Sequence, residues 1–175
     1  MVKKIIIDTD PGIDDSLAIF IALNSPELEV LGLTTVFGNA VTKTCTENAL
    51  RLLEIAERID IPVAEGAHAP LNGNFRGAAT FVHGDDGQGN AKLPLPTTQA
   101  LKIDAVTFLN ETIENNPNEI TLVPVGPLTN IANLLTKHPG IDAKIKEIVL
   151  MGGNARSPGN ATPTAEANIL NDPEA

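Results

Sequence analysis

Two patterns of apolar residues alternate along this chain. Short runs rich in Ile, Leu and Val predict buried strands at 2–7, 28–37, 61–65, 119–125 and 146–151. Apolar residues at helical spacing, with Pro, Gly and Ser at the boundaries, predict helices at 42–59, 100–115 and 127–137 and a short helix from Asp14 or Asp15 to about Asn24. Strands that alternate with helices indicate a single α/β domain over residues 1–175. We expect an open, doubly wound, mainly parallel sheet with helices on both faces.

The helix predicted at 42–59 has the clearest amphipathic pattern. Its apolar residues recur at spacings of three and four, and they are Cys45, Ala49, Leu52, Leu53, Ala56 and Ile59. Because Cys45 lies on this stripe, we expect a core residue and not a reactive thiol. It is also the single cysteine, which excludes an intrachain disulfide and suits a reducing compartment.

Polar and glycine-rich tracts follow the predicted strands at their carboxyl ends. They comprise residues 8–15, 38–39, 126–130 and 152–154, and a long segment at 66–98 is rich in Gly, Pro, Asn and Asp. In doubly wound sheets, ligands bind beyond the carboxyl ends of the strands, near a topological switch point. The sequence therefore predicts a ligand site at this edge, with 66–98 as a functional loop.

Four carboxylates crowd the first of these tracts: Asp8, Asp10, Asp14 and Asp15. The amino terminus of the following helix favours negative charge, which accounts for Asp14 and Asp15 taken alone. Four like charges at close range raise one another's pKa unless a positive group intervenes, and a hard cation such as Ca²⁺ or Mg²⁺ would serve. An EF-hand loop counted from Asp8 would need Glu at its twelfth position, where the chain has Ile19, so that motif is excluded.

Charge and hydropathy exclude two classes of partner. The formal net charge is −10, and no run of Lys or Arg offsets it, so we expect no nucleic acid and no membrane surface as partner. The longest apolar run, 17–23, is shorter than the roughly 20 residues of a membrane span. A cytoplasmic location is the default expectation.

Two families fit a strand followed by Asp-x-Asp. In a haloacid-dehalogenase-type phosphatase, Asp8 would be the nucleophile and Asp10 the acid/base beside Mg²⁺, but that pattern does not have Pro11 and Gly12 after the second Asp. The sequence DTDPGIDD more closely resembles the signature of the inosine-uridine preferring nucleoside hydrolases. Further blocks resemble that family in the same order: VFGN, HGDDGQGN, GPLTN, MGG and GNATPTAEANILNDPEA.

This resemblance implies Ca²⁺-dependent hydrolysis of the N-glycosidic bond of a small-molecule ribonucleoside. Asp10, Asp15 and the main-chain carbonyl of Val125 would hold the metal, and Asp10 would also accept a proton from the attacking water. His83 would approach the 5′ side of the nucleoside or its base, and Asp8 would support Asp10 without ligating the metal. Contacts to the sugar would come from Asp14, Asn39, Met151, Asn160, Glu166 and Asn168, with Glu166 and Asn168 on one side of an extended segment.

Length and two residues depart from the family pattern. Gln88 stands where the family usually has an apolar residue, and Ala167 stands where it often has Phe. Both differences leave the base preference open. Family members are nearly twice as long, and their second half normally supplies a further metal-binding Asp and a His that protonates the leaving base. The chain is thus expected to be the amino-terminal part of a longer hydrolase domain and to form a homo-oligomer. A catalytically inactive Ca²⁺- or ribose-binding domain and the phosphatase are the alternatives.

Overall fold

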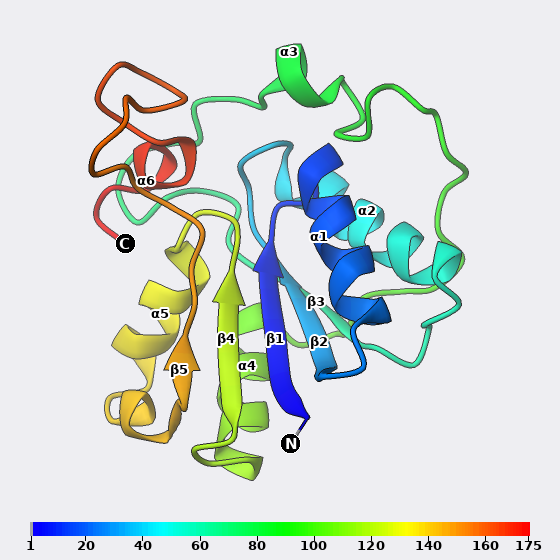
Figure 1. Cartoon of the computed structure of the whole chain (residues 1–175), viewed down its shortest axis with the longest axis vertical. Helices are drawn as coiled ribbons and strands as arrows, with labels where there is room; N and C mark the ends of the chain where they lie inside the picture. The colour runs from blue at the N-terminus through cyan, green and yellow to red at the C-terminus, as the bar shows by residue number, and fades with distance from the viewer. Residues whose placement is uncertain (1) are drawn as a thin grey trace.

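Five parallel strands form one sheet in the computed structural model, which describes residues 2–175 (Figure 1). The strands are β1 (Lys3–Thr9), β2 (Leu28–Thr35), β3 (Val63–Glu65), β4 (Ile120–Pro124) and β5 (Glu147–Ile148). Their order is β3-β2-β1-β4-β5. The chain therefore winds outward from β1 to β3 and then returns to the other side of β1, which puts the topological switch point between β1 and β4.

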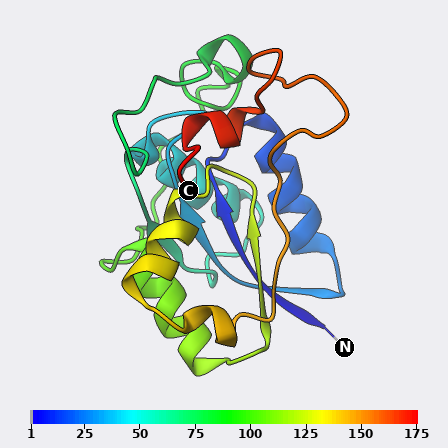
Figure 2. The same ribbon diagram turned by 90° about the vertical axis from the view of Figure 1, so that its left-hand side faces the viewer.

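Helices cover both faces of this sheet. Residues of α1 and α2 pack on one face and residues of α4 and α5 on the other, and Figure 2 shows α1 opposite α4 and α5. The helices are α1 (Ile13–Asn24), α2 (Thr42–Ile55), α3 (Thr80–His83), α4 (Ala105–Asn115), α5 (Thr129–Lys137) and α6 (Ala167–Asn171), with a 3₁₀ turn η1 (Ile141–Lys144). This arrangement confirms the expected fold class.

Strand β1 is nearly continuous in apolar residues because it is covered on both sides. Ile5 and Ile7 belong to the core beneath α1 and α2, whereas Ile6 belongs to the core beneath α4 and α5. Successive side chains of a strand point to opposite faces, so a central strand needs apolar residues at every position. This burial fixes where β1 ends and thus where its terminal aspartates lie.

Helix α2 is shorter than predicted. It ends at Ile55, because Ala56 caps it and Glu57 takes a left-handed backbone conformation with φ of 56°. Ile59, predicted on the buried stripe, is 68% exposed. Cys45 is fully buried as predicted, and burial raises the pKa of its thiol.

Other predicted boundaries also shift. Helix α4 begins at Ala105 and not at residue 100, because the Asp104 side chain caps it by accepting from the Thr107 amide. The strand predicted at 146–151 is reduced to Glu147–Ile148, although the Val149 and Met151 amides still donate to carbonyls of β4. Helices α3 and α6 and the turn η1 were not predicted from the sequence, and the remaining boundaries differ by a residue or two.

Within residues 2–175, every helix is too short or too polar to cross a membrane.

Candidate active site

The four aspartates lie at the switch point between β1 and β4. Their segment leaves the carboxyl end of β1 and turns at Pro11–Gly12 into α1. The Val125 and Gly126 amides, just after β4, both donate to the Asp8 carbonyl. Segments containing α3 and α6 pass above the same edge of the sheet (Figure 1). The predicted edge is therefore where residues distant in the sequence meet.

Asp10 is buried, with 1% of its surface exposed. Its Oδ2 accepts from the Asn39 amide at 2.7 Å, whereas its Oδ1 has no hydrogen-bond partner among residues 2–175. Burial raises its pKa well above the usual value, and the nearby Asp15 carboxylate adds to this. Only glycine fits at Gly38 and Gly126, because a Cβ at either position would press on the Asp10 carboxylate.

Asp15 is held by three donors at the start of α1. Its Oδ1 accepts from the Thr9 hydroxyl at 2.8 Å, and its Oδ2 accepts from the Gly12 amide at 3.1 Å and from Asn39 Nδ2 at 2.9 Å. Burial raises the pKa of Asp15, and the donors oppose that shift. Asp14, the next residue toward the amino terminus, is exposed, as expected for a charge that interacts with the helix dipole from the surface.

His83 approaches the same turn from the end of α3. It is buried, and its Nδ1 accepts from the Ile13 amide at 3.2 Å. Asp14 Oδ1 lies 3.9 Å from that nitrogen. A Cβ at Gly12 would lie 2.7 Å from His83 Nδ1, so the glycine allows the imidazole to pack on the turn. Because Nδ1 accepts, the neutral imidazole carries its proton on Nε2.

Asp8 lies behind Asp10 in a buried polar network. Its Oδ1 accepts from the Thr34 hydroxyl and from Asn130 Nδ2, whereas its Oδ2 has no partner in the described part of the chain. Burial raises the pKa of Asp8 to about 6. Asn130 also donates to the Thr35 carbonyl and accepts from the Ala67 amide, so a single side chain joins β1, β2 and the segment after β3.

A second group of predicted residues is organised around α6. Asn168 Nδ2 donates to the Val125 carbonyl at 2.8 Å and lies 3.1 Å from the Met151 carbonyl. Glu166 caps α6 by accepting from the Asn168 amide, and it also accepts from the Gly153 amide at 2.9 Å. Glu166 and Asn168 would lie on one side of their segment if it were extended, and it is not extended, because the capping carboxylate of Glu166 starts a helix there.

The predicted residues thus form two groups with the end of β4 between them. One group comprises Asp10, Asp14, Asp15, Asn39 and His83 on the turn and its neighbours. The other comprises Val125, Met151, Glu166 and Asn168, with Asn160 attached at its edge through the Ala167 amide at 2.9 Å. Met151 and Asn160 are exposed, and no hydrogen bond joins the side chains of the two groups within the described residues.

The ligands at the Pro11–Gly12 turn suit a hard divalent cation, although side chains alone do not complete a metal site there. No cluster of three His, Cys, Asp or Glu side chains in residues 2–175 is arranged to hold a metal. The available donors are two buried carboxylates, Asp10 and Asp15, and backbone carbonyls, all of which are the oxygen ligands that Ca²⁺ and Mg²⁺ prefer. The unpartnered Oδ1 of Asp10 is an anionic atom that a cation would satisfy. The donor set therefore fits such a metal.

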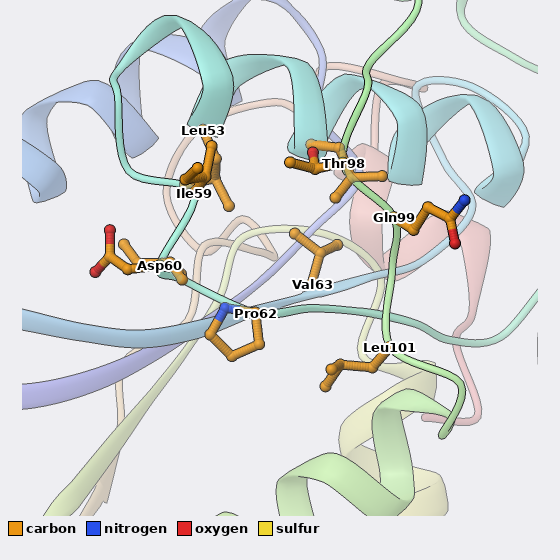
Figure 3. A pocket seen from close by; sticks show the side chains of 10 residues that line it. Leu53, Ile59, Asp60, Pro62, Val63, Thr98, Gln99 and Leu101 are labelled. Atoms are coloured by element: carbon orange, nitrogen blue, oxygen red, sulfur yellow. The ribbon is translucent and has the colours of Figure 1, made fainter.

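A separate cavity of about 250 Å³ lies far from this site, before the amino end of β3 (Figure 3). Its lining is mostly apolar and includes Leu53, Pro62, Val63 and Leu101. Its one carboxylate, Asp60, pairs with Arg58. The cavity offers none of the convergent polar groups seen at the turn.

Comparison with known proteins identifies the family. The model of the inosine-uridine preferring nucleoside hydrolases matches residues 5–175. This chain belongs to that family. The family expectation drawn from the sequence motifs is confirmed, and the phosphatase alternative is set aside.

Similar nucleoside hydrolases include curated plant and bacterial proteins. Uridine nucleosidase 1 of Arabidopsis thaliana is 51% identical over 99% of this chain and 52% of its own length. The pyrimidine-specific ribonucleoside hydrolase RihA of Shewanella sp. is 48% identical over all of this chain and 54% of its own length. The chain spans about half the length of the curated relatives that it matches.

Solved nucleoside hydrolase structures share the fold of the whole chain. The plant nucleoside hydrolase PpNRh1 superposes with a TM-score of 0.97 at 48% identity, over 99% of this chain and 55% of that one. A purine-preferring ribonucleoside hydrolase from Gardnerella vaginalis superposes with a TM-score of 0.94 at 37% identity, over 98% of this chain and 55% of that one.

Two residues that support the candidate site were not singled out from the sequence. Asn130 was recognised only as part of the GPLTN block. Its place in the polar tract that follows β4 is a signal that could have predicted a role at the site. Asp172 was noted only within the terminal DPEA block. It is buried and accepts from the Thr129 hydroxyl and the Leu71 amide, which fastens the end of α6 to α5.

Proposed function

We propose that this chain provides the metal- and ribose-binding part of a hydrolase that cleaves the N-glycosidic bond of ribonucleosides with the help of Ca²⁺. The observation that carries the proposal is the buried Asp10, whose Oδ1 has no partner in residues 2–175, at the switch point of a nucleoside hydrolase fold. A buried, unpaired carboxylate oxygen is costly unless an ion, a water molecule or a substrate atom engages it.

Asp10, Asp15 and the Val125 carbonyl would hold the cation. A bound divalent cation lowers the pKa of a coordinated water and so makes a nucleophile available at neutral pH. Asp10 would also accept the proton of the attacking water, and the Asn39 backbone amide would hold its Oδ2 in place. Hydrogen bonds from Thr9 and Gly12 would keep Asp15 from rotating away.

The sugar would lie between the two groups of residues. Asn39 and Asn168 both use Nδ2 within the protein, which leaves the Oδ1 of each for a ribose hydroxyl. Asp14, Asn160 and Glu166 would add contacts to the hydroxyls, and Met151 would cover the ring. Departure of the base leaves positive charge on the ribose, and a pocket rich in carboxylate and amide oxygens stabilises an oxocarbenium-like transition state.

His83 would recognise the 5′ side of the nucleoside or its base. Its Nδ1 accepts from the Ile13 amide, so the proton on Nε2 is the one available for donation. The names of the relatives include uridine, pyrimidine-specific and purine-preferring enzymes, so both kinds of base belong in the test. The homo-oligomeric state and the cytoplasmic location expected from the sequence stay predictions.

Release of free ribose from inosine and from uridine tests this proposal. The purified protein is assayed with added Ca²⁺ and with excess chelator, and its folded state is checked by thermal unfolding. Calcium-dependent release is the expected result. Binding of Ca²⁺ or ribose without release would instead favour the inactive binding domain, and neither binding nor release by a folded sample would overturn the proposal.

A further inference from the structure

The backbone that separates Asp10 from Asp15 is held by a side chain from the long segment between β3 and α4. Gln88 Nε2 lies 3.2 Å from the Pro11 carbonyl oxygen and 3.0 Å from Ser16 Oγ. Ser16 Oγ in turn donates to the Gly12 carbonyl at 2.6 Å. Gln88 Nε2 also lies 3.3 Å from the Gly12 carbonyl oxygen, so it reaches both carbonyls of the Pro11–Gly12 turn directly and the second one through Ser16 as well.

Asn48 of α2 holds the same turn from below. It is fully buried, and its Nδ2 lies 3.2 Å from the Pro11 carbonyl and 3.0 Å from the Asp86 carbonyl. The turn and the loop that carries Gln88 are therefore joined through a side chain in the protein core. A buried amide with this many partners has one preferred orientation.

The loop around Gln88 is itself rigidly built. Asp86 accepts from the backbone amides of Gln88, Asn90 and Lys92, and the Asn90 side chain accepts from the Asp85 amide. The same segment continues along α2, where Arg51 donates to the Pro94 carbonyl (Figure 1). Gln88 thus projects from a fixed support and not from a freely moving loop.

The turn that Gln88 holds contacts three polar side chains of the site, His83, Asn39 and Asp15. A Cβ at Gly12 would lie 2.7 Å from His83 Nδ1 and 2.8 Å from Asn39 Nδ2, so the backbone packs closely against both. The Gly12 amide donates to Asp15. A small shift of this backbone would displace the donors of both buried carboxylates together.

We propose that in this chain Gln88, which stands where the family usually has an apolar residue, is a positioning residue that fixes the Pro11–Gly12 turn and so sets the geometry of the Asp10 and Asp15 carboxylates for a bound cation. This inference rests on the proposed function for the identity of the ligand, although the hydrogen bonds that carry it do not depend on activity. Residues that orient metal ligands typically change metal affinity about 10- to 100-fold when they are replaced.

The test uses two matched substitutions. Q88M keeps the length of the side chain and removes its donors, and Q99M makes the same change at an exposed glutamine on the same long segment, beside the separate cavity (Figure 3). Three quantities are measured: Ca²⁺ affinity by calorimetry, backbone hydrogen exchange of residues 10–16, and the thermal midpoint. Ribose release then separates kcat from KM.

Q88M is expected to weaken Ca²⁺ binding about tenfold or more and to speed exchange at residues 10–16 by a similar factor, while exchange in β4 stays unchanged. Q99M is expected to match the wild type in Ca²⁺ affinity and in exchange at residues 10–16. Equal exchange at residues 10–16 in the two variants would overturn the inference, whether or not the protein releases ribose. Failure of the wild type to bind Ca²⁺ or release ribose would count against the proposed function, and exchange would still decide the role of Gln88.

A second variant covers the case in which Q88M does not fold. Q88A removes the contacts of Gln88 with Pro11, Gly12 and Ser16 without placing a larger apolar group against the turn. It is expected to speed exchange at residues 10–16 severalfold without a comparable change in β4. Unchanged exchange in Q88A would then overturn the inference.

Discussion

The two halves of the candidate site are built in different ways. The turn cluster (Asp8, Asp10, Asp15, Asn39 and Asn130) is buried apart from the half-buried Asn39, and it is held by bonds from β1, β2, α1 and α5. The α6 cluster (Met151, Asn160, Glu166 and Asn168) is largely held by bonds within residues 151–169 and one contact to Val125. More elements of the fold therefore hold the turn cluster than hold the α6 cluster. The three buried aspartates lie in the cluster that more elements hold.

Removal of the Asp10 charge should show the largest effect. D10N keeps the shape of the side chain and removes a buried anion, so we expect ribose release to fall about 10³-fold or more. In the absence of metal, the D10N protein should be at least as stable as the wild type, because burial and Asp15 both oppose ionisation of Asp10. Ribose release and thermal unfolding measure the two quantities.

A matched change at the exposed Asp142 of η1, D142N, controls for the loss of one negative charge. It should leave both quantities near their wild-type values. A D10N protein that retains substantial ribose release would show that the turn cluster does not carry the chemistry.

Loss of Asn130 should disrupt the turn cluster as a whole. N130A removes one of the two donors to Asp8 Oδ1, together with the Asn130 donor to the Thr35 carbonyl and the Asn130 acceptor of the Ala67 amide. We expect the free energy of unfolding to fall by about 3 kcal/mol, because unsatisfied buried polar groups cost about 1–3 kcal/mol each. Urea unfolding of N130A, with N115A at the exposed carboxyl end of α4 as the matched control, measures this change. An equal fall in the free energy of unfolding in both variants would contradict the stabilising role of the Asn130 hydrogen bonds.

These two clusters also mark what the sequence could predict. The alternation of strands and helices was readable because buried parallel strands are apolar throughout, and the turn was readable because its aspartates lie within eight positions. The contact of Asn130 with Asp8 spans 122 residues and exists only because β4 lies beside β1. Helix α6 was missed because a capping carboxylate, and not an apolar period, starts its five residues.

The α6 cluster should respond more weakly and locally. E166A removes the acceptor of the Gly153, Asn168 and Ile169 amides, so we expect a loss of about 1 kcal/mol, typical of a helix cap. E166Q keeps an acceptor oxygen and should retain most of that stability, whereas both variants should raise KM for the nucleoside. Unfolding and steady-state kinetics measure these effects. Cooperative destabilisation as large as that of N130A would contradict the contrast between the clusters.

The partly exposed carboxylate of Glu54 lies outside both clusters and extends the comparison to a more weakly held group. Glu54 Oε1 accepts from the backbone amides and hydroxyls of Thr97 and Thr98, and these bonds, led by the Thr98 amide, lower the pKa of Glu54 to about 2. A folded-state pKa below the usual 4.5 means that its stabilising effect is present above about pH 4.5 and is lost as the pH falls through about 2.

The expected consequence is a local release of residues 97–98 from α2 at acid pH, with a small effect on global stability because the group is exposed. The Thr98 amide proton resonance, followed by NMR from pH 5 downward, should report that release with a midpoint near 2. In E54Q the same resonance should show no such titration. A midpoint near the ordinary value of 4.5 would show that four donors at an exposed site do not hold a carboxylate as firmly as the buried bonds of the turn cluster hold theirs.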